Sequence, residues 1–189
     1  MRPLLLVVAL LALAAGCASG GGSAPVTTAS SSVPPVPAVT GTVATLPAGA
    51  VPTGFRAVTL VIIAADGSVH ESCVLVAESD ADRARGLMEV DSLGGYDGML
   101  FRFGAPTKSQ FFMFHTRLPL SIAFFDAAGA FVSARDMAPC TESSGGACPL
   151  YAADHAYVDA LEVVQGGLAP LGIGTGARIE VGASCSRSP

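Results

Sequence analysis

The beginning of the chain is apolar, without alternation of polar and apolar positions. One positive residue, Arg2, precedes a continuous apolar run over residues 4–15, which ends at Gly16 and Cys17. A run of this length suits a secretory signal peptide and is too short to span a bilayer. We therefore expect residues 1–16 to be a signal peptide that is removed on export, with Cys17 as the first residue of the mature protein.

The residues before Cys17 resemble the lipobox of bacterial lipoprotein precursors, in which small residues precede a cysteine that receives a diacylglyceryl group. Ala14 departs from that motif, which usually has Leu or Val at this position. The alternative is an ordinary signal peptide that happens to contain a cysteine. Lipid on Cys17 would anchor the protein to the cell membrane or the outer membrane on its extracytoplasmic side, making that membrane one partner of the chain.

Residues 18–54 carry no charge and no periodic apolar face, and consist mainly of Ala, Gly, Ser, Thr, Pro and Val. Such a segment cannot offset the entropy lost on ordering. We expect residues 17–54 to form a flexible Pro/Ser/Thr/Gly tether, locally extended around Pro34, Pro35 and Pro37. A single globular domain over residues 55–189 would follow.

From residue 55 onward the pattern is typical of strands, because short β-branched and aromatic runs alternate with turn residues. Asp66-Gly67 predicts a hairpin, and Ser79 with Asp82 resembles a capping box for one short helix that ends near Leu87. The expected strands cover residues 57–65, 69–77, 99–103, 110–116, 121–126, 130–136, 157–164 and 177–181, with a helical turn near 168–171. The predicted fold class is α+β, mostly antiparallel β, with a compact curled sheet or barrel-like core and one or two short helices.

The charge of the chain argues against nucleic acid as a partner. The formal net charge is −5, the chain has a single lysine, and positive residues form no stripe. Proteins that bind nucleic acid neutralise phosphates with clustered lysine and arginine. We therefore expect no nucleic-acid partner.

The domain contains four cysteines besides Cys17: Cys73, Cys140, Cys148 and Cys185. Four cysteines allow three pairings, and an exported compartment permits disulfides. The short segment between Cys140 and Cys148 closes easily, so we expect that pair, with Cys73 joined to Cys185. The alternative is a zinc site from Cys140, Cys148 and His155, although the spacing lacks the short knuckle of structural zinc sites.

Several short blocks follow one another in a fixed order: Gly86-Leu87-Met88, Gly98-Met99-Leu100-Phe101, Phe111-Phe112-Met113-Phe114-His115-Thr116, Pro119-Leu120-Ser121-Ile122-Ala123-Phe124-Phe125, Met137-Ala138-Pro139-Cys140 and Leu161-Glu162. Together, over about residues 69–181, they resemble the bacterial and archaeal family called domain of unknown function 192. The resemblance implies a compact β-rich fold and brings no settled activity.

Two positions depart from the family pattern. His115 stands where the family usually has the Asn of Trp-Met-x-Asn-Thr, and Ser121 stands where it usually has the Asp of Pro-Leu-Asp. If that Asn and Asp form a polar site in relatives, these two residues replace its members here. Our candidate binding residues are His115, Thr116, Ser121, Arg85 and Glu162.

No strong catalytic motif is present: the chain has no Gly-x-Ser-x-Gly elbow, phosphate-binding glycine loop or His-Glu-x-x-His sequence. We therefore favour a non-catalytic module of the cell envelope that binds an envelope protein or a small ligand, without a cofactor. One alternative is a copper-binding protein, because Met113 and His115 would share a face if residues 110–116 form a strand. Methionine more often fills gaps in a core. The other alternative is an enzyme of unrecognised type.

Overall fold

The computed structural model describes residues 50–187. The expected signal peptide, Cys17 and residues 18–49 of the expected tether lie outside the described residues. Within the described part, no helix is both long and apolar enough to cross a membrane.

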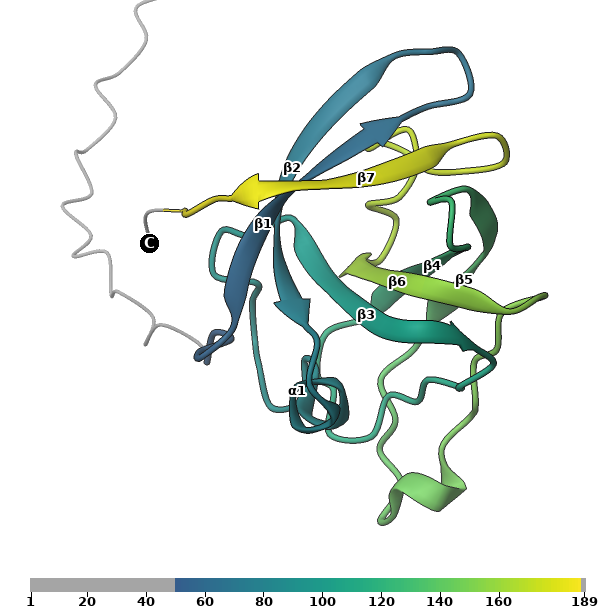
Figure 1. The fold of residues 1–189 in the computed structure, drawn as a ribbon. Helices are drawn as coiled ribbons and strands as arrows, with labels where there is room; N and C mark the ends of the chain where they lie inside the picture. Colours follow the sequence, from purple (N-terminus) through teal and green to yellow (C-terminus); the bar gives the residue numbers. More distant parts are fainter. Residues whose placement is uncertain (1–49, 188–189) are drawn as a thin grey trace, which may run out of the picture. The chain divides into compact units, whose positions relative to one another are not determined.

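Within residues 50–187, seven strands form one sheet, accompanied by one short helix and one 3-10 turn (Figure 1). The elements are β1 Arg56–Ile63, β2 Val69–Ala77, α1 Asp80–Arg85, β3 Gly98–Thr107, β4 Leu120–Phe125, β5 Phe131–Met137, η1 Gly145–Ala147, β6 Tyr157–Val164 and β7 Arg178–Ser184. The strand order is β5-β4-β6-β3-β2-β1-β7. All neighbours are antiparallel except β2 and β3. The fold is therefore mostly β, with less helix than the expected α+β class implies.

The two edge strands of the sheet, β5 and β7, meet at one end only. Ala130 and Arg178 form an isolated antiparallel bridge, and the backbone N–H of Ile179 donates to the carbonyl oxygen of Gly129 at 2.8 Å. A Cβ on Gly129 would lie only 2.2 Å from the carbonyl oxygen of Ile179, and Gly129 has a φ of +75°. Only glycine therefore suits this close approach of the two backbones. The sheet curls until its edges touch, but it does not close into a barrel.

The helix α1 begins and ends as its sequence indicates. Ser79 Oγ accepts a hydrogen bond from the Asp82 N–H at 3.0 Å and donates to the Asp82 carboxylate at 2.7 Å, which confirms the predicted N-cap. Gly86 ends the helix with a φ of +47°. A Cβ there would lie 3.1 Å from the ring of Phe101. The helix therefore stops at Arg85, before the predicted end near Leu87.

The prediction of a strand over residues 110–116 is wrong. Only isolated bridges occur there, from Phe111 to Tyr151 and from Phe114 to Cys140. The segment turns at once after the second bridge, because the Thr116 N–H donates to the Met113 carbonyl oxygen at 3.1 Å. Its aromatic composition is typical of a strand, but its backbone has no continuous partner. Composition alone therefore does not predict its structure.

The expected helical turn near residues 168–171 is also not a helix. The Leu171 N–H donates to the Leu168 carbonyl oxygen at 3.2 Å, and the Gly172 N–H donates to Ala169 at 2.9 Å. These are successive turns rather than helical repeats. Pro170 has no N–H to donate, and Gly172 has a φ of +73°, so the turns cannot propagate.

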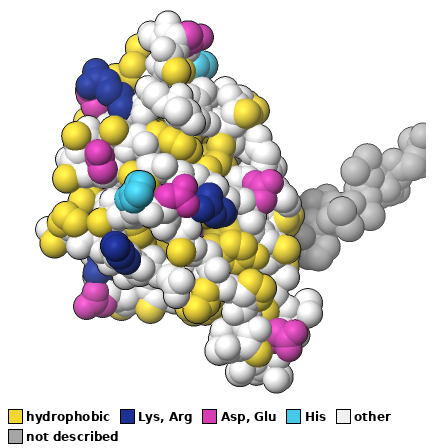
Figure 2. All heavy atoms as spheres, turned by 90° about the vertical axis from the view of Figure 1, so that its right-hand side faces the viewer, with side chains coloured by type: hydrophobic (Ala, Val, Ile, Leu, Met, Phe, Trp, Pro, Cys, Tyr) yellow, Lys and Arg dark blue, Asp and Glu magenta, His cyan; other side chains and the backbone are white. Residues whose placement is uncertain are grey.

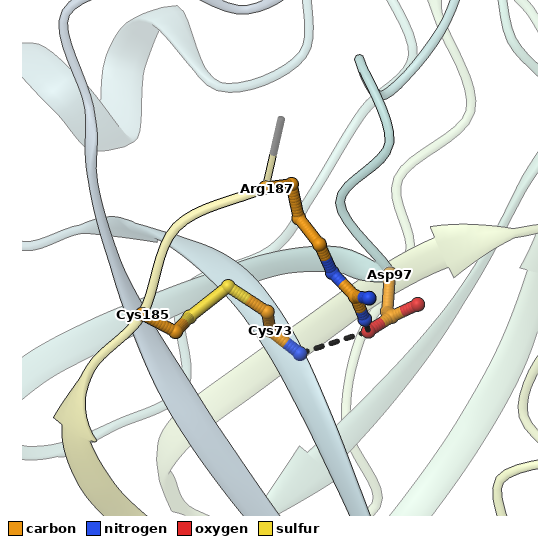
Figure 3. Close-up of a disulfide and its surroundings, with 4 residues drawn as sticks. All are labelled: Cys73, Asp97, Cys185 and Arg187. Atoms are coloured by element: carbon orange, nitrogen blue, oxygen red, sulfur yellow. Dashed lines mark hydrogen bonds and ion pairs between the residues drawn. A yellow bond between two sulfur atoms is a disulfide. The ribbon is translucent and has the colours of Figure 1, made fainter. Parts of the chain in front are cut away.

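The four cysteines of the domain lie in two pairs, with the sulfur atoms of each pair at bonding distance. The pairs are Cys73 with Cys185 and Cys140 with Cys148, the same pairs that the sequence analysis expects. The first pair links β2 to the residue that follows β7 (Figure 3). The Asp97 carboxylate beside it accepts from the Cys73 N–H at 2.8 Å and from the Arg187 guanidinium at 2.6 Å.

The zinc alternative finds no support in the described residues. Cys140 and Cys148 face each other, and His155 is exposed. Within residues 50–187, no group of three or more His, Cys, Asp or Glu side chains is placed to hold a metal ion.

Candidate functional site

A cavity of about 320 Å³ lies between the helix α1, the strand β3 and the segment of residues 109–112. Residues 83–88 and residues 109–112 line it, together with Phe101 and Phe103 of β3, Thr116 and Glu162. This volume falls in the range of pockets that hold small organic molecules.

The topology of the sheet explains why the segment that contains α1 lies beside the cavity. Since β2 and β3 are parallel neighbours, the chain must return to the starting end of β2 before β3 begins. The connection over residues 78–97 contains α1 and passes along the sheet. Its turn at Gly86 presses against Phe101, so α1 is held at the rim of the cavity.

Glu162 is the unusual residue of this cavity. It lies on β6 between Met99 of β3 and Ile122 of β4, and both of these neighbours belong to the hydrophobic core. An alternating strand would place an apolar residue at this position. The Glu162 side chain is instead an acid, and the residue is only 4% exposed.

The Glu162 carboxyl has no charged partner and no hydrogen-bond donor among residues 50–187, and burial alone raises its pKa to about 8. No buried side-chain oxygen in the described part is both sealed from solvent and unpaired. The carboxyl oxygens of Glu162, which have no partner among the described residues, therefore face the cavity that the residue lines. At neutral pH the group is mostly protonated, so it can both donate and accept a hydrogen bond.

The two arginines at the rim are already engaged. The Arg83 guanidinium donates to the carbonyl oxygen of Arg102 at 2.7 Å, pairs with Asp80 and lies 5.0 Å from the centre of the Phe103 ring. The Arg85 guanidinium lies 4.0 Å from the centre of the Phe55 ring and 3.7 Å from the Asp82 carboxylate. Arg83 and Arg85 thus hold the rim in place, and neither neutralises Glu162.

Aromatic rings stiffen the remaining walls. Phe101 packs edge-on against Phe111 with ring centres 5.0 Å apart, and Phe103 packs edge-on against Tyr157 at 5.4 Å. Phe111 also contacts Phe124 of the core at 5.9 Å. Such edge-to-face contacts fix ring orientation. The cavity is therefore bounded in large part by packed aromatic rings, and Glu162 is its one acid.

Three of the five candidate residues from the sequence meet in this cavity: Arg85, Thr116 and Glu162. Ser121 does not. It is 1% exposed, and its hydroxyl donates to the Asp136 carboxylate at 2.5 Å and accepts from the Gly166 N–H at 2.9 Å. These bonds tie β4 to β5 and to the turn after β6.

His115 lies outside the cavity, in a surface ion-pair network. Its Nδ1 is 2.5 Å from the Glu89 carboxylate, and that contact is the largest cause of the lowered pKa of Glu89. Arg117 joins the network through Glu89 at 2.8 Å and Asp91 at 3.1 Å. His115 and Glu89 are the two non-glycine residues with positive φ in the described part, at +55° and +63°. The Glu89 N–H also donates to the His115 carbonyl oxygen at 2.8 Å. These contacts join the two segments that carry the cavity residues Met88 and Thr116.

The pair considered for copper is divided between the core and the surface. Met113 is 1% exposed inside the core, whereas the His115 side chain is 50% exposed and bound to Glu89. The strand that would align Met113 with His115 is absent. This arrangement offers copper no shared ligand face.

Sequence reasoning missed the aromatic residues that line the cavity: Phe101, Phe103, Phe111 and Phe112. The sequence pattern predicts Phe101 and Phe103 in a strand over 99–103 and Phe111 and Phe112 in a strand over 110–116, and it indicates no site role for any of them. Their apolar character was visible in the sequence, but a wall of a cavity and a packed core have the same composition. Of the sequence signals, only the blocks that resemble the family include both Gly86 and Glu162.

The fold and the cavity define a mostly β domain with one strongly curled sheet and a preformed one-sided pocket. The model of the DUF192 family, described as an uncharacterized ACR, matches residues 61–181. The match covers more than half of the chain, so the chain belongs to this family. No curated protein matches the chain.

Two solved structures have the same fold. A protein from Sinorhizobium meliloti 1021, described as a candidate transcription regulator, is 25% identical, with 69% of this chain and 97% of that chain covered and a TM-score of 0.61. A protein of unknown function from Novosphingobium aromaticivorans DSM 12444 is 28% identical, with 71% of this chain and 93% of that chain covered and a TM-score of 0.59.

Proposed function

We propose that this protein is a non-catalytic binding module of the cell envelope that holds a small, largely apolar ligand in the cavity. One observation carries the proposal: the Glu162 carboxyl lies buried among apolar side chains, has no partner among the described residues and lines the cavity. Buried polar groups are normally paired. A ligand with a polar group at its inner end would supply the partner that the protein lacks.

The lining supports binding over catalysis. It contains a single acid, Glu162, and no histidine or cysteine. Acid–base and nucleophilic reactions usually require two such groups within hydrogen-bond reach. An aromatic-lined space with a few polar groups is typical of a binding site.

The description of the Sinorhizobium meliloti relative suggests DNA as a partner, but the charges of this chain do not support that role. The net charge is −5. Figure 2 shows charged side chains of both signs scattered among hydrophobic ones on one face, without a continuous positive area. A DNA-binding face needs clustered positive charge to displace counterions.

The test uses tryptophol, a neutral indole alcohol, as a probe of the cavity. The chain has no tryptophan, so the indole fluorescence of the probe can be followed without interference from the protein. We expect saturable binding that Ala84→Phe weakens at least tenfold, because Ala84 lines the cavity. Ala81→Phe on the same helix is the matched control and should bind normally. Absence of saturable binding, or equal loss in both variants, would contradict the proposal.

The envelope location is the second part of the proposal and rests on the lipobox-like residues before Cys17. Lipid on Cys17 would hold the domain at a membrane. We expect Cys17→Ser to move the full-length protein into the soluble fraction and to leave the precursor unprocessed. A variant that stays in the membrane pellet after a carbonate wash would show that another element anchors the chain.

A further inference from the structure

We propose that the ligand of the cavity is an organic cation, an ammonium group on a small apolar or aromatic body, with its N–H groups directed at the Glu162 carboxylate. This inference rests on the proposed binding function and names the chemical class of the ligand. It concerns the choice of an acid, rather than a neutral polar residue, at this buried position.

The first argument is the position of the acid. Glu162 lies opposite Met99 and Ile122 in the sheet register, where apolar neighbours offer it no hydrogen bond. A neutral ligand group needs only a hydroxyl or an amide as its partner, whereas only an acid can supply a full negative charge. A cationic ligand would bring both the compensating charge and the missing donors.

The second argument is the aromatic lining. Phe101, Phe103, Phe111 and Phe112 surround the space into which the Glu162 carboxyl opens. The faces of aromatic rings attract cations, and the attraction is stronger where water is excluded. Carboxylate and aromatic rings together therefore favour an ammonium group over an anion of the same size.

The third argument is the balance of charge at the rim. Arg83 and Arg85 would repel a cation if their charges were free, but Arg83 pairs with Asp80 and Arg85 lies 3.7 Å from Asp82. The arginine charges are thus matched on α1 itself. Glu162 remains the one ionisable side chain of the lining that has no partner among the described residues.

The experiment compares tryptamine with tryptophol, which share the indole ring and differ in carrying an ammonium or a hydroxyl group. The tryptamine ammonium stays charged from pH 6 to pH 9, as lysine does. Because burial raises the pKa of Glu162 to about 8, the affinity for tryptamine should rise by up to roughly 90-fold between these pH values as the carboxyl ionises. Tryptophol affinity should not rise.

Glu162→Gln is the decisive variant, and Glu142→Gln on an exposed loop is its matched control. We expect Glu162→Gln to abolish the rise of tryptamine affinity with pH while tryptophol still binds. The control should behave like the wild type. If Glu162→Gln does not fold, proton release by the wild type serves instead: tryptamine binding near pH 7 should release close to one proton, measured by calorimetry in buffers of different ionisation enthalpy.

The outcomes separate this inference from the proposed function. If tryptophol binds and tryptamine binds no better at pH 9, or binds without proton release, the cation assignment is wrong and the binding module stands. If neither probe binds, the proposed function fails together with the inference. A tryptamine preference that survives in Glu162→Gln would place the cation elsewhere and overturn the inference.

Discussion

Two buried acids on β6 differ in their partners, although they are only three residues apart: one forms an ion pair and the other has no partner among the described residues. Asp159 is 8% exposed and Glu162 is 4% exposed. In the register with β3, Asp159 lies beside Arg102, whose Nε is 3.2 Å from its carboxylate, whereas Glu162 lies beside Met99. Burial raises the pKa of both acids, but Arg102 opposes the rise only at Asp159. The neighbouring strand therefore decides whether a buried acid forms an ion pair or remains without a partner beside the cavity.

The comparison predicts its largest effect at the unpaired acid. Glu162→Met should remove the loss of stability that the wild type suffers as pH rises. The folded-state pKa of about 8 is raised above the ordinary 4.5, so the contribution of Glu162 to stability is full below pH 4.5 and is lost as pH rises through 8. This loss, which Glu162→Met should not show, should reach roughly 5 kcal/mol at pH 9. Urea unfolding of both proteins from pH 4 to pH 9 measures it, and parallel pH profiles would refute it.

A smaller effect of opposite sign is expected at the paired acid. Asp159→Asn leaves Arg102 without its main carboxylate and should lower the free energy of unfolding by about 2 kcal/mol. The loss should change little between pH 6 and pH 9. Asp154→Asn, which removes an exposed partner of Arg135, is the control and should change stability by about 0.5 kcal/mol or less. Equal losses in the two variants would mean that burial of the pair does not matter.

An effect of similar size is expected from the cation of the pair. Arg102→Met should cost about 2 kcal/mol, because it leaves the Asp159 side chain, which is only 11% exposed, without its cation. It should also raise the pKa of Asp159 further. Combining Arg102→Met with Asp159→Asn should cost less than the two changes added together. A strictly additive double-mutant cycle would show that the two side chains are not coupled.

The fold could be predicted largely from local pattern. Alternating β-branched residues located β1, β2 and β6, and Ser79 with Asp82 located the start of α1. The segment 110–116 was misassigned because its backbone partners, Tyr151 and Cys140, lie far away in sequence. The side-chain pattern indicates which face of a sheet a residue occupies. It does not indicate which strand pairs with the backbone of that residue.

The site could be predicted only in part, for the same reason. Glu162 stood among the candidates through the resemblance, but its lack of a partner depends on Met99 and Ile122, which pair with it across two strand interfaces. His115 and Ser121 were chosen because they differ from the family pattern. Both have local partners, Glu89 and Asp136, that satisfy them away from the cavity.

The parallel pairing of β2 and β3 has a consequence for how such a protein can change over evolution. The connection that this pairing requires, residues 78–97, supplies the cavity-lining residues 83–88 and contributes no strand to the sheet. Substitutions in this connection alter the shape of the cavity without shifting any strand register, while Glu162 stays fixed on β6. Among proteins with this fold, we expect the crossover to diversify the body of the ligand that is accepted and the sheet to preserve the polar contact.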